Sequence, residues 1–476
     1  MKSITKIYTI LLGIFLVPNA IAQIPIYQDD SKPLEMRVKD ALKRMTLAEK
    51  LKVIHAQSKF SSAGVPRLGI PEVWMTDGPH GIRAEVLWDE WEQAGWTNDS
   101  CTAFPALTCL AATWNPEIAA LYGRSIGEEA RYREKDVLLG PGVNIYRTPL
   151  NGRNFEYMGE DPYLASQMVV PYIKGVQANG VAACVKHFAL NNHETNRHTT
   201  DVYVSDRALY EIYLPAFRAA IKEGGAWAIM SSYNLFEGTH VGQNKRLLKD
   251  ILRGEWNFDG VVISDWGGIH NSEQAIKNGV DMEFGSWTDG LSSGSMNAYD
   301  NYYLAMPYLK LIQEGKVGTQ ELDEKVSNVL RLIFRTAMNT RKPFGAFATP
   351  EHAVAACKIG EEGVVLLKNQ DGLLPVNLGK TRKIAVIGEN AIKKMTVGGG
   401  SSSLKVKNEI SPLDGLKARF EPEGIEVKYA RGYIGDVGNE YNGVTSGQDL
   451  NESKSSQDLI EEALKIAADA DCVLFI

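Results

Sequence analysis

The sequence predicts an α/β protein whose first part is a (β/α)8, TIM-like barrel. Short apolar runs that suit buried strands alternate with longer amphipathic stretches that suit helices. Such alternation indicates a parallel sheet covered on both faces. Each apolar run ends directly in polar or charged residues, which is where barrels and doubly wound sheets both bind ligands. No glycine-rich phosphate loop follows the first strand, and this favours the barrel.

Five apolar runs carry the prediction of the barrel sheet. Continuous rather than alternating hydrophobicity marks them as strands buried on both faces. Amphipathic stretches between and after them predict helices at 206–223, 245–256 and 272–278. The five runs lie at 137–139, 181–185, 226–230, 261–263 and 279–283.

Two short helices are expected before the barrel strands, within residues 34–56. Apolar side chains recur there at steps of three and four residues. Thr46 and Glu49 form a Thr-x-x-Glu capping box, so a second helix should begin at that point.

A second α/β unit is expected after a boundary near residue 340. We place a catalytic domain at 23–340, a linker at 341–352 and the second domain at 353–476. The second unit should contain helices at 350–363 and 456–469. Its expected strands are 364–369, 383–388 and 472–476, with the glycine-rich stretch 398–403 as a loop. The last run resembles a buried strand, and a terminus there predicts a domain that is truncated.

The first 22 residues read as a signal peptide. A basic start is followed by the apolar run 7–17, and Ala20-Ile21-Ala22 supplies the small residues of a cleavage site before Gln23. We therefore expect a secreted or periplasmic protein, with no membrane span because every apolar run is too short. The formal charge of −7 becomes −9 once a signal peptide with two lysines and no acids is removed. No nucleic acid or anionic membrane is expected as a partner.

Five cysteines in 476 residues do not make a disulfide scaffold. Cys101 and Cys109 could pair if the loop between them folds back, whereas Cys184 should be a buried thiol. The histidines between 187 and 198 fit no standard zinc spacing. We therefore expect no metal and no cofactor.

Asp265, which follows the run 261–263, is the first candidate for a catalytic group. An ionised carboxylate at the end of an apolar strand costs stability unless it has partners, which favours a function. A carboxylate in this position could attack a sugar ring during retaining glycoside cleavage. The alternative is an aspartate that caps the next helix or closes a turn. The spacing alone leaves the two interpretations evenly balanced.

Other polar clusters are weaker signals when each is taken alone. Lys186-His187 would place two donors at a strand end, although a surface lysine beside a core histidine is the simpler interpretation. Asp77 with Arg83 could bind hydroxyl groups, although an ordinary Asp-Gly turn explains the aspartate equally well. The clusters at 152–156 and 191–197 fit a solvated surface.

Taken together and in order, these segments resemble glycoside hydrolase family 3, in its β-glucosidase branch. The resemblance extends from about residue 30 to the end of the chain. The matching segments are Asp77-Gly78-Pro79 with Arg83, Gly152-Arg153-Asn154-Phe155-Glu156, Lys186-His187-Phe188, 191–197, Met230-Ser231-Ser232-Tyr233-Asn234 and Ser264-Asp265-Trp266.

The resemblance implies a (β/α)8-like domain followed by an α/β sandwich, here incomplete, and a role for each matching residue. Asp265 would be the catalytic nucleophile. Asp77 would accept hydroxyls, and cations around both carboxylates should keep them ionised. The residues implied to bind substrate are Asp77, Arg83, Arg153, Lys186, His187, Arg197, Met230, Tyr233 and Trp266.

Two departures from related branches narrow the expected function. The His-Asp acid/base of the N-acetylglucosaminidase branch is not matched at 189–195, and the xylosidase branch tends to have glutamate at the position of Asp77. The glucosidase branch takes its acid/base glutamate from a position beyond 472–476, and Glu389 is a poor substitute because it lies early in the second unit. No acid/base is therefore assigned.

The sequence thus predicts a retaining exo-acting β-glycosidase that hydrolyses terminal non-reducing β-D-glucosyl residues. Its expected partner is a β-linked oligosaccharide or glucoside. Two alternatives stay open: a β-xylosidase or other β-glycosidase of the same family, and a sugar-binding fragment without turnover. The oligomeric state is not predicted.

Overall fold

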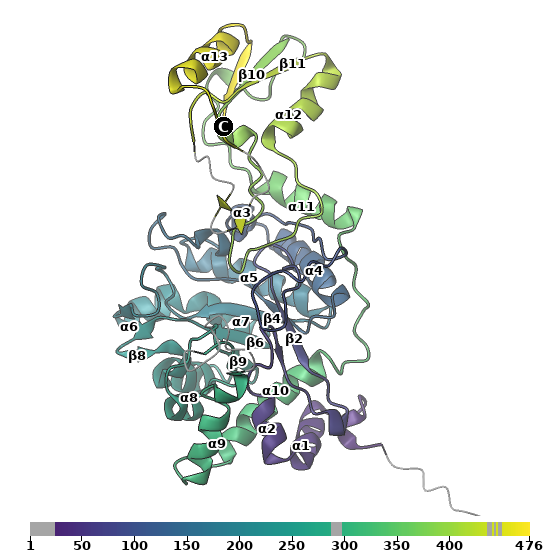
Figure 1. Cartoon of the computed structure of the whole chain (residues 1–476), viewed down its shortest axis with the longest axis vertical. Coiled ribbons are helices and arrows are strands. Elements are labelled where there is room, and N and C mark those ends of the chain that lie inside the picture. Colours follow the sequence, from purple (N-terminus) through teal and green to yellow (C-terminus); the bar gives the residue numbers. More distant parts are fainter. Residues whose placement is uncertain (1–23, 287–297, 436–439, 442–443, 446–449) are drawn as a thin grey trace, which may run out of the picture.

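The computed structural model describes residues 24–286, 298–435, 440–441, 444–445 and 450–476 (Figure 1). The expected signal peptide lies outside these residues. Within them, no helix combines the length and the hydrophobicity that a membrane crossing requires.

The first unit is built on a six-stranded sheet, and four of its strands fall on the predicted runs at 137–139, 181–185, 226–230 and 261–263. Its first two strands were not predicted. Its strands are parallel except the first, which is antiparallel to its neighbour. The order is β1 (Ser61–Ser62), β2 (Val73–Asp77), β3 (Val137–Leu139), β4 (Ala182–Phe188), β6 (Ala228–Ser231) and β9 (Val261–Ile263).

Isolated backbone bridges continue this sheet from its last strand back to its first. Met282 pairs with Ile263, Glu283 with His55, and Ala56 with Ser62 of β1. The predicted strand at 279–283 therefore exists only as such bridges. The curled sheet and its ring of helices confirm the predicted barrel-type α/β fold, in which the strand ends converge on one rim.

Helices surround the sheet, and several begin at recognisable caps. Thr46 and Glu49 form the predicted capping box between α1 (Leu34–Arg44) and α2 (Leu47–Lys52). The other helices of this unit are α3 (Leu107–Ala112), α4 (Pro116–Tyr132), α5 (Pro162–Gln177), α6 (Asp206–Ala208), η4 (Leu209–Tyr213), α7 (Pro215–Lys222), η6 (Arg246–Glu255), α8 (Ser272–Asn278), α9 (Met306–Gln313) and α10 (Gln320–Arg335).

Two of the predicted helices differ from continuous α-helix. The stretch expected at 206–223 divides into α6, the π-helical η4 and α7, and the division falls before Pro215, which has no backbone N–H to continue the ladder. The helix expected at 245–256 is the π-helical η6.

The second unit lies above the barrel in Figure 1. Its three-stranded parallel sheet has the order β11 (Glu426–Ala430), β10 (Lys383–Ile387) and β14 (Cys472–Phe475), with α12 (Pro412–Phe420) and α13 (Ser456–Ala468) beside it. Helix α11 (Pro350–Gly363) packs on α3 and α4 of the first unit. The short elements of both units are η1 (Ile26–Gln28), η2 (Pro66–Leu68), η3 (Asn154–Glu156), β5 (Asp201–Val202), β7 (Leu235–Phe236), β8 (Thr239–His240), η5 (Val241–Gln243), η7 (Ala298–Asn301), η8 (Gln370–Gly372), η9 (Glu389–Ala391), η10 (Glu421–Glu423), β12 (Glu440–Tyr441) and β13 (Val444–Thr445).

The predicted strand at 364–369 is wrong for this structure. The residues from Val364 to Lys368 form no regular element, and Leu367 is 93% exposed. An apolar run becomes a strand only when a neighbouring strand accepts its backbone hydrogen bonds, and none of the described segments does so here.

The possible Cys101–Cys109 disulfide is also wrong, because all five cysteines are free thiols. The backbone of Cys101 is hydrogen-bonded to Lys405 and Lys407, whereas Cys109 lies beside Gly363 of α11. The two cysteines therefore contact different stretches of the chain and not each other. Cys184 is fully buried, as predicted.

Candidate active site

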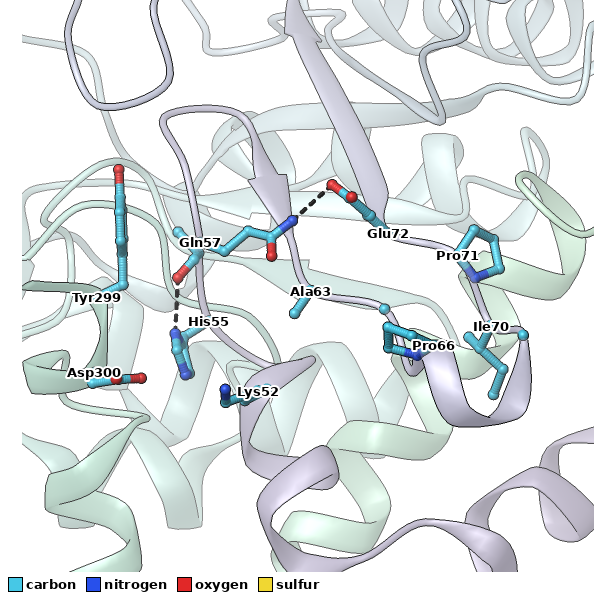
Figure 2. A pocket seen from close by; sticks show the side chains of 13 residues that line it. Lys52, His55, Gln57, Ala63, Pro66, Ile70, Pro71, Glu72, Tyr299 and Asp300 are labelled. Atoms are coloured by element: carbon cyan, nitrogen blue, oxygen red, sulfur yellow. Dashed lines mark hydrogen bonds between the residues drawn. The ribbon is translucent and has the colours of Figure 1, made fainter. Parts of the chain in front are cut away.

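Two large cavities open on the first unit. One, of about 780 Å³, lies beside the start of β2, where Gln57 donates a 2.7 Å hydrogen bond to Glu72 (Figure 2). Its carboxylates, Glu72 and Asp300, are both exposed. The other cavity, of about 770 Å³, opens where the barrel strands end, and we call it the catalytic cavity. All ten site residues predicted from the sequence line it: Asp77, Arg83, Arg153, Lys186, His187, Arg197, Met230, Tyr233, Asp265 and Trp266.

Asp265 lies two residues beyond β9, in a tight turn at the floor of the catalytic cavity, and is 7% exposed. Its Oδ1 accepts a 2.8 Å hydrogen bond from the backbone N–H of Trp266. The hydroxyl of Tyr233 also donates to this carboxylate. One oxygen, Oδ2, lies 3.6 Å from Nε2 of His187. The carboxylate is therefore oriented by two hydrogen bonds, and Asp265 lines the cavity.

Burial and the nearby cations act in opposite directions on the pKa of Asp265. Burial raises the pKa of this carboxyl above its ordinary value of 3.8, although Arg153, Lys186 and Arg197 and the Tyr233 hydrogen bond all act in the opposite direction. Desolvation is the larger effect on this pKa, and the expectation that the cations keep the carboxylate ionised stays a prediction.

His187 is fully buried and held in one orientation. The side chain of Asn144 binds its backbone twice, accepting from the N–H at 2.7 Å and donating to the carbonyl at 2.9 Å. Burial and nearby cations hold the pKa of His187 well below its ordinary value, so the ring is neutral. Because Arg153 can only donate, Nε2 of His187 accepts from it at 3.1 Å, and the proton lies on Nδ1, which donates to Tyr157 at 3.1 Å.

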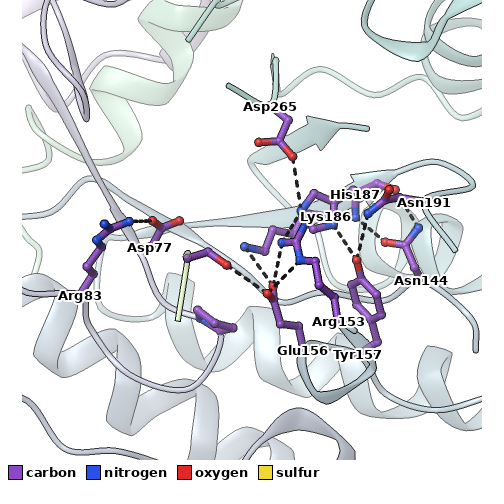
Figure 3. A network of polar contacts seen from close by, with 12 residues as sticks. Asp77, Arg83, Asn144, Arg153, Glu156, Tyr157, Lys186, His187, Asn191 and Asp265 are labelled. Atoms are coloured by element: carbon purple, nitrogen blue, oxygen red, sulfur yellow. Dashed lines mark hydrogen bonds and ion pairs between the residues drawn. The ribbon is translucent and has the colours of Figure 1, made fainter. Parts of the chain in front are cut away.

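A buried ion-pair network forms the wall beside His187 (Figure 3). Arg153 donates to both oxygens of Glu156, at 3.0 and 3.1 Å, and Nζ of Lys186 lies 3.5 Å from the same carboxylate. Burial opposes ionisation of Glu156, but these cations lower its pKa to about 2. Glu156 thus stays charged and is paired with two of the cations that surround the cavity.

Asp77 and Arg83 form a second polar wall. Asp77 is the last residue of β2, and its Oδ2 accepts a 2.8 Å hydrogen bond from Nη1 of Arg83. The Arg83 amide also donates to the Asp77 carbonyl at 3.1 Å, which closes the loop between them. Both side chains are 11% exposed, so one oxygen of a partly desolvated carboxylate remains available to a ligand.

The second unit contributes the loop 398–403, which the sequence suggested only as a loop. Oγ of Ser401 donates to Oε1 of Glu156 at 3.0 Å, and Gly398, Gly399, Gly400, Ser401 and Ser403 all line the catalytic cavity. The absence of side chains matters at Gly398, where a Cβ would lie 3.0 Å from the ring of Phe155.

Sequence reasoning missed several lining residues. Two features of the sequence could have pointed to them: the triple glycine before Ser401 and the unusual density of tryptophans at 88, 91 and 96. Glu194 was noticed only as part of a polar segment, although it pairs with Arg197 at 2.8 Å. The missed residues of the described lining are Trp91, Gly152, Phe155, Glu156, Glu194, His198 and the residues of the loop named above.

Glu389 does not line the catalytic cavity. Its buried carboxylate binds Arg431 and Lys393, and it accepts from the amide of Gly435 at 3.1 Å. These contacts fit a structural ion pair within the second unit, as expected from its early position there.

Comparison with known proteins places the chain in a family. Residues 46–332 match the family model described as the glycosyl hydrolase family 3 N-terminal domain, and residues 364–476 match that family's C-terminal domain. The chain belongs to glycosyl hydrolase family 3, which is the resemblance that its motifs suggested.

Individual relatives support this assignment. "Beta-glucosidase BoGH3A" of Bacteroides ovatus is 58% identical over 95% of this chain and 60% of its own length. An exo-alpha-(1->6)-L-arabinopyranosidase of Bifidobacterium longum is 36% identical over 91% and 54%. The structure of beta-glucosidase 3B from Thermotoga neapolitana with glucose has a TM-score of 0.73 and 36% identity over 82% and 55%. The chain thus spans about half to three fifths of the length of these relatives.

Proposed function

We propose that this chain carries the nucleophile and the sugar-binding residues of a retaining, exo-acting β-glucosidase. The observation that supports this most is Asp265 itself, a buried carboxylate that is oriented by two hydrogen bonds and lines a cavity of polar donors. The names of the Bacteroides and Thermotoga relatives agree with this class of substrate.

In the proposed reaction the terminal β-D-glucosyl ring lies in the catalytic cavity. Asp77, held by Arg83, accepts hydrogen bonds from its hydroxyls, while Lys186 and Arg153 donate to others. An oxygen of ionised Asp265 attacks the anomeric carbon, and the bond to the leaving oxygen breaks. Water then cleaves the glycosyl ester, which releases glucose and restores the carboxylate. The leaving oxygen needs a proton, and we assign that general acid to no described residue.

The nucleophile can be tested without a general acid. A 2,4-dinitrophenyl 2-deoxy-2-fluoro-β-D-glucoside has a leaving group that needs no protonation, so the ester on the nucleophile should accumulate. Mass spectrometry of the intact chain and its peptides should locate the adduct on Asp265, and Asp265→Asn should give none. Asp259→Asn, a surface aspartate that is paired with Arg335, is the control that should label normally. A folded chain that stays unlabelled, or is labelled elsewhere, would overturn the proposal.

Glucose rather than xylose is proposed because Asp77 is shorter than the glutamate of the xylosidase-like pattern and leaves room for a hydroxymethyl group. The arabinopyranosidase relative is a reason to test this choice directly. Labelling by the fluoroglucoside should exceed labelling by the matching fluoroxyloside, and the reverse order would favour the β-xylosidase alternative. Saturable binding of glucose without any labelling would favour the sugar-binding fragment.

Secretion is a separate proposal that rests on the first 22 residues of the sequence. Expression with the native N-terminus in a bacterium should yield a mature chain that begins at Gln23. N-terminal sequencing of the periplasmic fraction tests this, and a retained Met1 would contradict it.

A further inference from the structure

A short hairpin beside the catalytic cavity takes no part in the reaction described above. Within it, Leu87 donates to the carbonyl of Glu92 at 2.9 Å, and Ala94 donates to the carbonyl of Glu85 at 2.7 Å. The tip is held at two points. The amide of Lys59 donates to the Trp88 carbonyl at 3.0 Å, and the hydroxyl of Tyr299 donates to Asp89 at 2.7 Å. We call residues 85–94 the tryptophan hairpin.

Trp91 brings one side of this tip to the mouth of the catalytic cavity. Its ring lies 6.4 Å from that of Trp266 and 5.8 Å from that of Phe60. The guanidinium of Arg83 lies 5.4 Å from the same ring. Despite these contacts Trp91 remains 41% exposed, so a large aromatic surface faces the entrance of the catalytic cavity.

Trp88 lies on the other side of the tip and lines a neighbouring cavity of about 350 Å³. It is 46% exposed and packs against Trp74 with ring centroids 5.8 Å apart. Trp96 lines the same cavity and is 53% exposed. Lys59 and Phe60 line this cavity and also contact Trp91, so the two cavities share one wall.

The composition of this second cavity fits a sugar ring. Aromatic faces alternate with charged donors and acceptors, because Glu85, Arg133 and Lys135 line it together with the tryptophans. A β-linked sugar ring presents C–H groups on its faces and hydroxyls at its edges, which suits such a mixture. Glu85 is paired with both Arg133 and Lys135, and these three side chains are mostly buried, so the surface that the cavity offers is mainly that of its tryptophans.

We propose that the tryptophan hairpin binds the leaving-group side of β-linked gluco-oligosaccharides, with Trp91 as the inner platform and Trp88 as the outer one. This inference rests on the proposed function, since it takes the catalytic cavity as the site of the terminal glucosyl ring. A disaccharide would reach Trp91 only. Longer chains would continue over the hairpin tip to Trp88 and Trp96.

The test is the dependence of affinity on chain length, measured by calorimetry on Asp265→Asn chains that cannot turn the sugar over. Glucose and β-1,3- and β-1,4-linked oligosaccharides of two to four units are the probes. Affinity should rise with length in at least one series. Trp91→Ala should weaken binding of the disaccharide and of longer chains about tenfold, which corresponds to about 1.4 kcal/mol. Trp88→Ala should remove only the gain between two and four units.

Trp114→Ala is the matched control, because Trp114 is 76% exposed and lines neither cavity. The proposal is overturned if affinity does not rise with length in either series, or if Trp88→Ala behaves like Trp114→Ala. Fluoroglucoside labelling of Asp265 in the unsubstituted chain is a separate readout. Labelling without a length effect rejects the hairpin and retains the glucosidase, whereas absent labelling rejects the glucosidase.

Discussion

Oγ of Ser401 donates a 3.0 Å hydrogen bond to Oε1 of Glu156, a carboxylate 245 positions earlier in the chain. Glu156 holds Arg153, and Arg153 donates to Nε2 of His187. The loop of the second unit is thus linked to a neutral histidine beside Asp265 through two intermediate side chains. This link suggests that the second unit helps to position the sugar-binding wall of the first.

Replacing Ser401 with alanine should weaken this link. One hydrogen bond to a charged acceptor is lost, so the free energy of unfolding in urea should fall by about 1–2 kcal/mol. Glucose affinity should fall a few-fold because the loop is less firmly held. Ser403→Ala, in the same loop but with no bond to Glu156, is the control. Equal effects of the two substitutions on stability and affinity would show that the Ser401–Glu156 hydrogen bond does not hold the loop in place.

The pH dependence of fluoroglucoside labelling should reflect the raised pKa of Asp265. Only the ionised carboxylate attacks, so the rate should fall as pH drops through a pKa above the ordinary value of 3.8. Tyr233→Phe removes a hydrogen bond that stabilises the charged form. We therefore expect the acid limb to move to higher pH and the rate to fall about tenfold. The exposed Tyr163→Phe should change neither, and a limb that moves to lower pH in Tyr233→Phe would contradict the assignment.

Asp77 should control both affinity and the choice of sugar. Asp77→Asn removes the negative charge that accepts hydrogen bonds from the sugar hydroxyls, and it leaves Arg83 without its ion-pair partner. Glucose binding should therefore weaken roughly 10- to 100-fold, or about 1.5–3 kcal/mol. Asp77→Glu should shift the ratio of labelling from fluoroglucoside toward fluoroxyloside, because the added methylene fills the space of the hydroxymethyl group. Asp206→Asn, on the surface, is the control. An unchanged ratio in Asp77→Glu would refute the steric argument.

Glu283 predicts a pH dependence of stability. This fully buried glutamate accepts from the amide of Leu304 at 2.7 Å, and burial raises its pKa to about 8. Between the unfolded value of 4.5 and about 8, the folded state binds the proton that the unfolded state has released. The stability that this group contributes is therefore present at low pH and is lost as pH rises through that window. The free energy of unfolding should fall by at most about 1.4 kcal/mol for each pH unit.

Glu283→Gln should remove this dependence, because glutamine stays neutral. Urea unfolding at pH 5.5 and 8 should show a smaller fall in free energy for the variant than for the unsubstituted chain, by a few kcal/mol at most. The exposed Glu421→Gln should retain the full fall. If both variants lose the same stability over this range, Glu283 is not the group that titrates.

The barrel and the gathering of its site residues were predictable from the sequence for one physical reason. His187 and Asp265 lie just beyond apolar runs that the sequence marks as strands, and parallel strands bring such positions to one rim. The strand that ends at Asp77 was not predicted. Local signals such as the Thr46–Glu49 capping box were equally readable, since they depend only on neighbours in the chain.

Features that depend on distant partners were not predictable. The bond from Ser401 to Glu156 joins segments whose proximity no local pattern encodes. The strand expected near Leu367 failed because hydrophobicity marks a segment that could pair but does not supply its neighbour. The raised pKa of Asp265 depends on how much water the fold excludes, whereas the sequence revealed only the cations.

Charge balance around the catalytic cavity has a consequence for the second half of the proposed reaction. With His187 and His198 neutral, the formal charges of the described lining residues cancel when Asp265 is ionised. Formation of a glycosyl ester would consume one negative charge and leave the site with an excess positive charge in a poorly solvated space. Hydrolysis would restore neutrality, so the network should favour release of the sugar over storage of the ester. The residues are the acids Asp77, Glu156, Glu194 and Asp265, and the bases Arg83, Arg153, Lys186 and Arg197.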